Sequence, residues 1–316
     1  MSVSTVPWVE KYRPVKLGEM VLSESTRRLI AAQLHPHNHT HLIIQGRPGI
    51  GKTSTARCLA SEILGERRNV AYLEINAADE RGTKNITTNV EPFCRRMISD
   101  IPYKIVVLDE ADNLTDKSQT DLVDVISRYM GKVRFFLLCN NSEKVAESLQ
   151  SICQIIQYQP LDLEGSIRYL EGICQSENLT YSLKGLELIA QIGSGDMRKN
   201  INNLQKIAFA HSTVTSKAIL DVCHYPDPEE IHVLIRRALK RDLIGMLTVF
   251  GEVRQKGYYY LDVISSVEHC LIYGRINPEA QSNMLTELYR LRLNLREACS
   301  FNLQFSAMLC KIASQD

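Results

Sequence analysis

A glycine-rich stretch of eight residues carries the clearest chemical signal in the sequence. Residues 46–53 read G-R-P-G-I-G-K-T, which matches the phosphate-binding pattern G-x-x-x-x-G-K-S/T, and the apolar run 42–44 precedes them. Glycines let backbone N–H groups turn inward around phosphate oxygens, Lys52 reaches the β- and γ-phosphates, and the hydroxyl of Thr53 ligates Mg²⁺. A helix predicted over 54–64 adds its positive N-terminal end. We therefore predict a nucleoside triphosphate site. Its loop residues are Gly46, Pro48, Gly49, Ile50, Gly51, Lys52, Thr53 and Ser54.

An acidic motif supplies the second half of this predicted site. Residues 105–112 read I-V-V-L-D-E-A-D, so a continuously apolar strand ends in acids about sixty residues after the glycine-rich loop. At the end of a neighbouring parallel strand, Asp109 is placed to hold the water shell of Mg²⁺. Glu110 is placed to polarise the water that attacks the γ-phosphate. The alternative is an acid-rich helix N-terminus without catalytic function.

Two further polar positions point to the same chemistry. Asn140 ends the apolar run 135–139, where an amide can sense the γ-phosphate; the alternative is an ordinary turn, in which Asn is common. Residues 195–198 read G-D-M-R at the start of a predicted helix, and Asp196 suits its N-cap. Because a cation in the first turn opposes the helix dipole, Arg198 indicates an anionic partner or else a solvated side chain.

Three other segments have both a functional and a simpler interpretation. Arg81, Thr83 and Lys84, beside the first N–H groups of a predicted helix, are candidates for gripping a phosphate backbone; the alternative is a capped loop. The alternating histidines of 35–41 flank a proline and have no carboxylate or cysteine among them, which favours a solvated loop over a metal site. Trp8 is either a wall of a base pocket or part of a core.

Composition limits the class of protein. The 316 residues, 44% hydrophobic and 23% charged, are typical of a soluble globular chain of two or three domains. No apolar run approaches the ~18 residues of a membrane span and no secretory signal is visible, so we expect no membrane partner. Nine scattered cysteines favour reduced thiols in a cytosolic or nuclear protein. Because the net charge is only +1, any DNA contact has to come from a local face or from helix N-termini.

The order of elements predicts an α/β domain followed by helices. Strand candidates at 42–45, 71–75, 104–108, 133–139 and 154–158 alternate with helical segments at 54–64, 83–98, 118–130 and 143–150. Such alternation argues for a parallel sheet flanked by helices. After residue 160 the strand signals stop, and Y-P-D-P at 225–228 is a predicted hinge before an all-helical tail.

Together these segments resemble one protein family. The segment 7–14, the glycine-rich loop, residues 76–82, the D-E-A-D strand, residues 139–140 and G-D-M-R follow the order found in small subunits of eukaryotic replication factor C. That complex is the sliding-clamp loader of the AAA+ class. The resemblance covers nearly the whole chain, and the ordered set is far more specific than any one motif. Residues 202–205 and 255–258 look most similar to the subunit that is second in human-type and fourth in yeast-type numbering.

The resemblance implies a three-part architecture and a role in a complex. It implies an AAA+ parallel-sheet P-loop domain over 1–160, a small helical lid over 161–225 and an all-helical collar over 226–316. It further implies an ATPase that works with other replication factor C subunits in a heteropentameric nuclear ring. That ring uses ATP and Mg²⁺ to load the clamp PCNA at primer–template DNA.

The resemblance also implies a role for each site residue. It assigns Lys52 and Thr53 to phosphates and Mg²⁺, Asp109 and Glu110 to Mg²⁺ and water, Asn140 to sensor 1 and Arg198 to sensor 2. The residues expected to act in catalysis are Glu110, Lys52, Asn140 and Arg198. Val9, Tyr12 and Arg13 fall in the segment that lines the adenine pocket. Phe93, Met97 and Ile98 fall where the family contacts the clamp, although a core role is an equal alternative.

Several positions depart from the family pattern. Where Ser-Arg-Cys is usual, this chain has Ser-Ile-Cys at 151–153, so Ile152 supplies no arginine finger to a neighbouring ATP site. The paired arginines usual after the D-E-A-D strand are replaced at 123–124 by Val-Asp. Thr87 and Asn89 stand where basic residues are usual, and Ala78 where serine is usual. This chain therefore lacks several of the basic residues that the family uses to contact neighbouring subunits and DNA, while its own ATP site is complete.

Three hypotheses follow for the function. The first is an ATP-hydrolysing clamp-loader subunit. The second is a structural subunit that binds nucleotide with little turnover, which the missing arginine at 152 favours and Glu110 opposes. The third is a general AAA+ protein that remodels other proteins.

Overall fold

The computed structural model describes residues 6–35, 38–78, 86–98, 101, 103–274, 276–297 and 299–314. The chain forms two compact units, Met1–Leu179 with Ile189–Gln205, and Thr180–Leu188 with Lys206–Asp316. The division at residues 160 and 225 stays a prediction.

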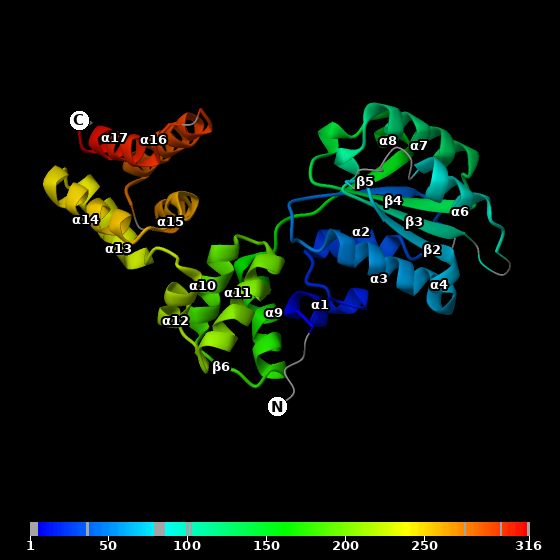
Figure 1. Ribbon diagram of the computed structural model, residues 1–316, viewed down its shortest axis with the longest axis horizontal. Coiled ribbons are helices and arrows are strands. Elements are labelled where there is room, and N and C mark those ends of the chain that lie inside the picture. Colours follow the sequence, from blue (N-terminus) through cyan, green and yellow to red (C-terminus); the bar gives the residue numbers. More distant parts are fainter. Residues whose placement is uncertain are drawn as a thin grey trace. The chain divides into compact units, whose positions relative to one another are not determined.

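A five-stranded parallel sheet forms the centre of the first unit (Figure 1). Its strands are β1 (His41–Gln45), β2 (Tyr72–Asn76), β3 (Lys104–Asp109), β4 (Val133–Cys139) and β5 (Cys153–Gln157), in the order β2-β3-β4-β1-β5. The register pairs Leu108 with Leu137 and Gln45 with Cys139. The carboxyl ends of β3, β4 and β1 therefore meet at one edge. The predicted α/β fold with a parallel sheet is confirmed.

Helices cover both faces of this sheet because its central strands are apolar on both sides. Along β3, Val106 and Leu108 pack with α6, α7 and α8, whereas Ile105 and Val107 pack with α2 and α3. Figure 1 shows α7 and α8 over one face and α2 and α3 over the other. The helices of this layer are α1 (Trp8–Lys11), α2 (Glu24–Ala32), α3 (Lys52–Leu64), α4 (Arg68–Ala71), α6 (Glu91–Arg95), α7 (Asp116–Arg128) and α8 (Glu147–Ile152).

Short turns connect several of these helices. The helix predicted over 83–98 ends at Arg95, after a π-helical turn over Ile86–Val90, and residues 83–85 lie outside the described residues. Single 3₁₀ turns are η1 (Leu17–Glu19), η2 (Gly65–Arg67), η4 (Ala111–Asn113) and η5 (Ser142–Lys144).

Helices dominate the chain after β5. They are α9 (Leu163–Ser176), α10 (Leu183–Gly193), α11 (Met197–Ala210), α12 (Ser216–Cys223), α13 (Pro228–Leu239), α14 (Leu243–Gln255), α15 (Tyr260–Tyr273), α16 (Pro278–Arg296) and α17 (Phe301–Ser314). The expectation that strands stop at residue 160 is wrong in one detail, because β6 (Thr180–Tyr181) pairs with β7 (Thr213–Val214). Two-residue strands are too short for alternation to reveal.

The second unit has an apolar core of its own. Residues from α13 to α17 form one buried cluster, in which Phe250 stacks on Phe305 with ring centroids 4.7 Å apart. The predicted hinge is the segment between α12 and α13, where Asp227 caps α13 by accepting the N–H of Glu229. Among the described residues, no helix combines the length and apolar character that crossing a bilayer requires.

His41 lies in the core at the start of β1 and not in a solvated loop. Its Nδ1 accepts the backbone N–H of Phe135 at 3.2 Å, and its ring meets the Phe135 ring edge-on. The neighbouring Arg134 is fully buried and donates to the carbonyls of Gln33 and Thr40. Burial, and then the charge of Arg134, lowers the pKa of His41 to about 4. Protonation would also break the hydrogen bond from Phe135.

We expect His41 to make stability depend on pH. The folded pKa lies below the unfolded value, so the contribution is complete above about pH 6.5 and is lost as the pH falls toward 4. At pH 5 the loss should be about 2 kcal/mol in the free energy of unfolding. Urea unfolding at pH 7.5 and 5.0 checks this. His41→Gln keeps an acceptor without titrating and should flatten this part of the profile; an equally steep profile would contradict the assignment.

Candidate nucleotide-binding site

The glycine-rich loop connects β1 to α3 in a conformation that only glycine adopts easily. Gly49 and Gly51 have φ values of 73° and 97°, and α3 begins immediately afterwards at Lys52. Gly46 has no room for a side chain, because a Cβ there would lie 2.3 Å from Cδ1 of Ile50. The loop is therefore closely packed, and it places the N-terminus of α3 beside the pocket.

Lys52 is buried although it carries a cation. Its Nζ donates to the carbonyls of Gly46 at 2.6 Å and Arg47 at 2.9 Å, and to Oδ1 of Asn140 at 2.9 Å. Burial lowers its pKa, and the positive charge of Arg198 acts in the same direction; Asp109 and other acidic groups oppose them. An ammonium with neutral hydrogen-bond acceptors and a desolvation cost is suited to receive an anion.

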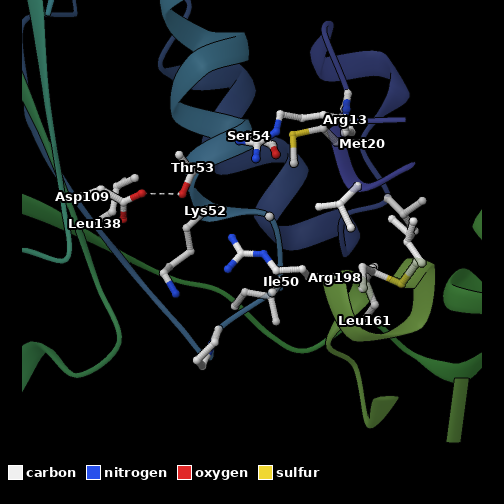
Figure 2. A pocket seen from close by; sticks show the side chains of 18 of the residues that line it. Arg13, Met20, Ile50, Lys52, Thr53, Ser54, Asp109, Leu138, Leu161 and Arg198 are labelled. Carbon is white, nitrogen blue, oxygen red and sulfur yellow. Dashed lines mark hydrogen bonds between the residues drawn. The ribbon is translucent and has the colours of Figure 1, made fainter. Parts of the chain in front are cut away.

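Thr53 and Asp109 come together from two different elements. The hydroxyl of Thr53, in the first turn of α3, donates to Oδ2 of Asp109 at 2.7 Å across the ends of β1 and β3 (Figure 2). A hydroxyl and a carboxylate in contact are hard oxygen donors of the type that Mg²⁺ takes alongside phosphate oxygens and water. The chemistry of this pair therefore fits the Mg²⁺ site that the sequence predicts.

Glu110 follows Asp109 in a strained backbone conformation. Its φ of 56° lies in the left-handed region, which non-glycine residues rarely adopt. Oδ1 of Asp109 accepts its backbone N–H at 2.9 Å, and its Oε2 accepts the amide of Asn113 at 3.1 Å. Strain of this kind gathers at functional sites, where the surrounding structure maintains it.

Arg198 approaches the loop from the N-terminal turn of α11. Figure 2 shows its guanidinium pointing from α11 toward the space beside Lys52 and Thr53. Among the described residues it has no hydrogen-bond or salt-bridge partner. The backbone N–H of Met197 donates to the carbonyl of Gly49 at 3.1 Å, so α11 contacts the glycine-rich loop directly.

These residues border one pocket of about 230 Å³. All of the predicted nucleotide residues line it except Gly46, which packs against Ile50 and Tyr158. The predicted residues that line it are Val9, Tyr12, Arg13, Pro48, Gly49, Ile50, Gly51, Lys52, Thr53, Ser54, Asp109, Glu110, Asn140 and Arg198. No sequence motif pointed to the apolar remainder of the wall. It consists mainly of Pro14, Met20, Val21, Leu138, Leu161, Tyr169, Met197 and Ile201.

The N-terminal segment is tied to the helix α9 that follows the sheet domain. The hydroxyl of Tyr12 donates to Oε1 of Glu177 at 2.5 Å, and Lys11 forms a salt bridge with the same carboxylate at 2.6 Å. The hydroxyl of Tyr169 donates to the carbonyl of Tyr12. Trp8 is buried edge-on against Tyr12 and does not line the pocket, so the core interpretation of this residue holds.

The predicted DNA contacts Arg81, Thr83 and Lys84 lie outside the described residues. Within the described part of the chain, no group of three or more His, Cys, Asp or Glu residues could hold a metal ion. The described cysteines are not joined to one another by disulfides.

Replacing Gly49 by alanine should weaken ATP binding about tenfold or more. The added Cβ would lie 1.8 Å from Oδ1 of Asp196, and the φ of 73° is unfavourable for alanine, so the loop has to move. Titration of ATP into the purified chain measures the effect. Gly131→Ala is the matched control. Gly131 also has a positive φ, of 81°, but a Cβ added there would have no atom within 4 Å, and the residue does not line the pocket. Equal affinities for both variants would contradict the packing account.

The chain is similar in sequence to known proteins over nearly its whole length. The family model described as "ATPase family associated with various cellular activities (AAA)" matches residues 42–161. A putative replication factor C small subunit of Acanthamoeba polyphaga mimivirus is 36% identical over 99% of this chain and 98% of its own length. Replication factor C subunit 4 of Saccharomyces cerevisiae is 33% identical over 97% of this chain and 95% of its own length. The replication factor C small subunit of Methanococcus maripaludis is 38% identical over 97% of this chain and 98% of its own length.

Solved structures support the fold alone. The Thermotoga maritima RuvB Holliday junction branch migration motor superposes with a TM-score of 0.57 at 14% identity, over 76% of this chain and 85% of that one. The parallel sheet, the phosphate-binding loop and the paired acids define a P-loop protein of the AAA+ class. The chain belongs to the replication factor C small subunits. Its yeast relatives in Saccharomyces cerevisiae and Schizosaccharomyces pombe are both named subunit 4, in agreement with the resemblance.

Proposed function

We propose that this chain is an ATP-hydrolysing subunit of a heteropentameric replication factor C ring that loads PCNA at primer–template DNA in the nucleus. The observation that carries the proposal is the contact of Thr53 with Asp109 beside Lys52 and Asn140, in a chain that matches clamp-loader small subunits over nearly its full length. This arrangement supports magnesium-dependent binding of a triphosphate.

Binding of ATP exchanges the partners of Lys52. Its Nζ turns from neutral carbonyls and the Asn140 amide to the β- and γ-phosphates, and backbone N–H groups of the loop take the remaining oxygens. Arg198, which has no other partner in the described chain, then faces the phosphates from α11. The apolar wall that includes Tyr12, Met197 and Ile201 suits the base and sugar.

Hydrolysis requires a base and an oriented water. Glu110 is the general base, and its rotation away from Asn113 frees the carboxylate to accept the proton of the attacking water. Asn140, released by Lys52, is free to hydrogen-bond the γ-phosphate or that water. Thr53 and Asp109 would hold Mg²⁺, which when bound would supply charge neutralisation for the phosphate oxygens.

The side chain at position 152 indicates that this chain contributes little to ATP hydrolysis at a neighbouring subunit's site. Ile152 ends α8 and packs, half-buried, against the apolar core of the sheet domain. It therefore supplies no cation, and a neighbouring site that depends on this position lacks a group worth ~10³ or more in rate. Ile152 is the observation that favours the second hypothesis, a nucleotide-binding structural subunit with little turnover.

The proposed clamp contact is the end of α6. Met97 is 89% exposed, while Phe93 and Ile98 are half-buried against the cores of the sheet domain. Nζ of Lys104 donates to the carbonyls of Phe93 at 2.6 Å and Cys94 at 2.7 Å, which fixes this end of the helix. Met97 is the residue best placed to meet PCNA. We also propose a DNA contact at Arg81, Thr83 and Lys84, because basic and hydroxyl side chains beside a predicted helix N-terminus suit a phosphate backbone.

Reconstitution of the ring tests the function. The full chain is assembled with the other subunits, and ATP turnover and clamp loading are measured with PCNA and primed DNA. We expect turnover stimulated by both, and loading that Glu110→Gln reduces. Loading that persists with an unchanged ATPase rate in Glu110→Gln would favour the structural subunit. A chain that binds neither PCNA nor its partner subunits, and shows no stimulation by DNA, would favour the protein remodeller.

A further inference from the structure

The turn η4, which follows Glu110 directly, makes side-chain contacts that the proposed reaction does not use. Oδ2 of Asp112 accepts the backbone N–H of Asn140 at 3.2 Å and that of Asn141 at 3.4 Å. The next residue of the turn, Asn113, donates to the carboxylate of Glu110. One short turn therefore contacts both the proposed base and the residue proposed to sense the γ-phosphate.

Asn140 needs such a contact because the sheet ends before it. The ladder between β1 and β4 stops at the pair Gln45 and Cys139, and the carbonyl of Cys139 accepts the N–H of Gly46. The N–H of Asn140 lies one residue beyond the ladder, so its position depends on an acceptor outside the sheet. Asp112 provides that acceptor.

Asp112 acts from behind the pocket. It does not line the pocket, and its second oxygen, Oδ1, is buried without a hydrogen-bond partner in the described structure. A buried carboxylate oxygen without a donor is costly, and such groups in native proteins require an explanation. The negative charge of Asp112 also helps to oppose the lowering of the Lys52 pKa. An acid in contact with the triphosphate would repel it strongly, whereas one that does not line the pocket repels it less.

We infer that Asp112 is a positioning residue for ATP hydrolysis, which links the turn after Glu110 to the backbone of Asn140. The inference rests on the proposed ATPase function. Asp112 holds Asn140 at the end of β4. In that position the Asn140 amide first contacts Nζ of Lys52 and then, once ATP binds, the γ-phosphate. The residue acts on turnover and not on ATP affinity, because Lys52, Thr53 and the loop keep their own contacts.

The test compares ATP turnover of the reconstituted ring with ATP binding to the full chain. The ring has several ATP sites, so the part of its turnover that Glu110→Gln removes is taken as the turnover of this chain's own site. Asp112→Ala should lower that share at least tenfold and change the ATP dissociation constant less than threefold. Asp112→Asn keeps an oxygen that accepts the N–H of Asn140, so its rate should be at least threefold above that of Asp112→Ala. Asp116→Ala, at an exposed acid of α7, is the matched control.

A double variant separates positioning from general damage to the fold. If Asp112 acts through Asn140, adding Asp112→Ala to Asn140→Ala should lower turnover no further. Multiplicative losses, an unchanged rate in Asp112→Ala, or a tenfold loss of ATP affinity would each overturn the inference. Absence of any turnover that depends on Glu110 would instead contradict the proposed function on which it rests.

Discussion

Replacing Lys52 by alanine should abolish useful ATP binding at this site, with a loss of about a hundredfold or more in affinity. The ammonium is the buried cation at the phosphate end of the pocket, and it gives up neutral acceptors to meet a highly charged ligand. A charge-assisted hydrogen bond of this kind contributes about 1.5–3 kcal/mol, and loss of the charge opposite phosphate adds to it. Calorimetric titration of MgATP into the full chain measures the change.

The control for this variant is Lys117→Ala, at an exposed lysine of α7. It removes the same charge from the chain and should leave ATP affinity unchanged. Thermal unfolding in the absence of nucleotide separates lost binding from lost folding, because Lys52→Ala relieves the desolvation of a buried cation as well as removing its hydrogen bonds. If rings with Lys52→Ala load clamps as well as the native ring does, ATP at this site is not needed for loading.

Replacing Glu110 by glutamine should stop hydrolysis while ATP still binds. Glutamine keeps the shape of the side chain and an oxygen that accepts the amide of Asn113, but it cannot take a proton from water. General-base catalysis typically contributes about 10²–10⁴-fold, so turnover at this site should fall at least a hundredfold. Single-turnover hydrolysis by the assembled ring, with affinity measured in parallel, checks both parts.

Glu66→Gln serves as the matched substitution, because Glu66 is exposed on the turn η2 after α3. Its turnover should equal that of the native chain. A loss of ATP affinity in Glu110→Gln equal to its loss of turnover would assign Glu110 to binding rather than to catalysis. Unchanged turnover would favour the structural-subunit hypothesis.

The phosphate end of the site was predictable because its signals are local. The spacing from Gly46 to Thr53 determines a loop and the start of a helix, and an apolar strand that ends in Asp109 places its carboxylate at the same sheet edge. Parallel strands bring their carboxyl ends together, so these two short segments suffice. The strands themselves were predicted to within one residue at each end, because apolar runs are also a local signal.

The rest of the pocket depends on tertiary packing. Met20, Leu161 and Tyr169 line it from three segments with no shared motif. Met197 and Ile201 offered the one available signal, since they lie one helical turn apart beside Arg198. The hydrogen bond between Asp112 and the backbone of Asn140 was equally unpredictable from the sequence, because it joins a turn after β3 to the end of β4.

His41 and Ile152 show two properties that local sequence patterns do not reveal: the burial of a polar residue and the packing partner of an apolar one. His41 was grouped with its solvated neighbours, yet it is the first residue of β1 and is 3% exposed. Apolar alternation does not reveal a buried histidine whose Nδ1 accepts a backbone N–H. For Ile152, the departure from the family pattern was visible, but its packing against the sheet core was not.

The central claim is that backbone N–H groups after β1 and the pair Thr53 and Asp109 hold a triphosphate with its metal. Its most direct test is ATP binding to the full chain, alone and in the assembled ring, with Mg²⁺ and with EDTA. We predict saturable binding that is at least tenfold stronger with Mg²⁺ and that loses this difference in Asp109→Asn. No magnesium-dependent affinity for adenine nucleotides in either form would contradict the account.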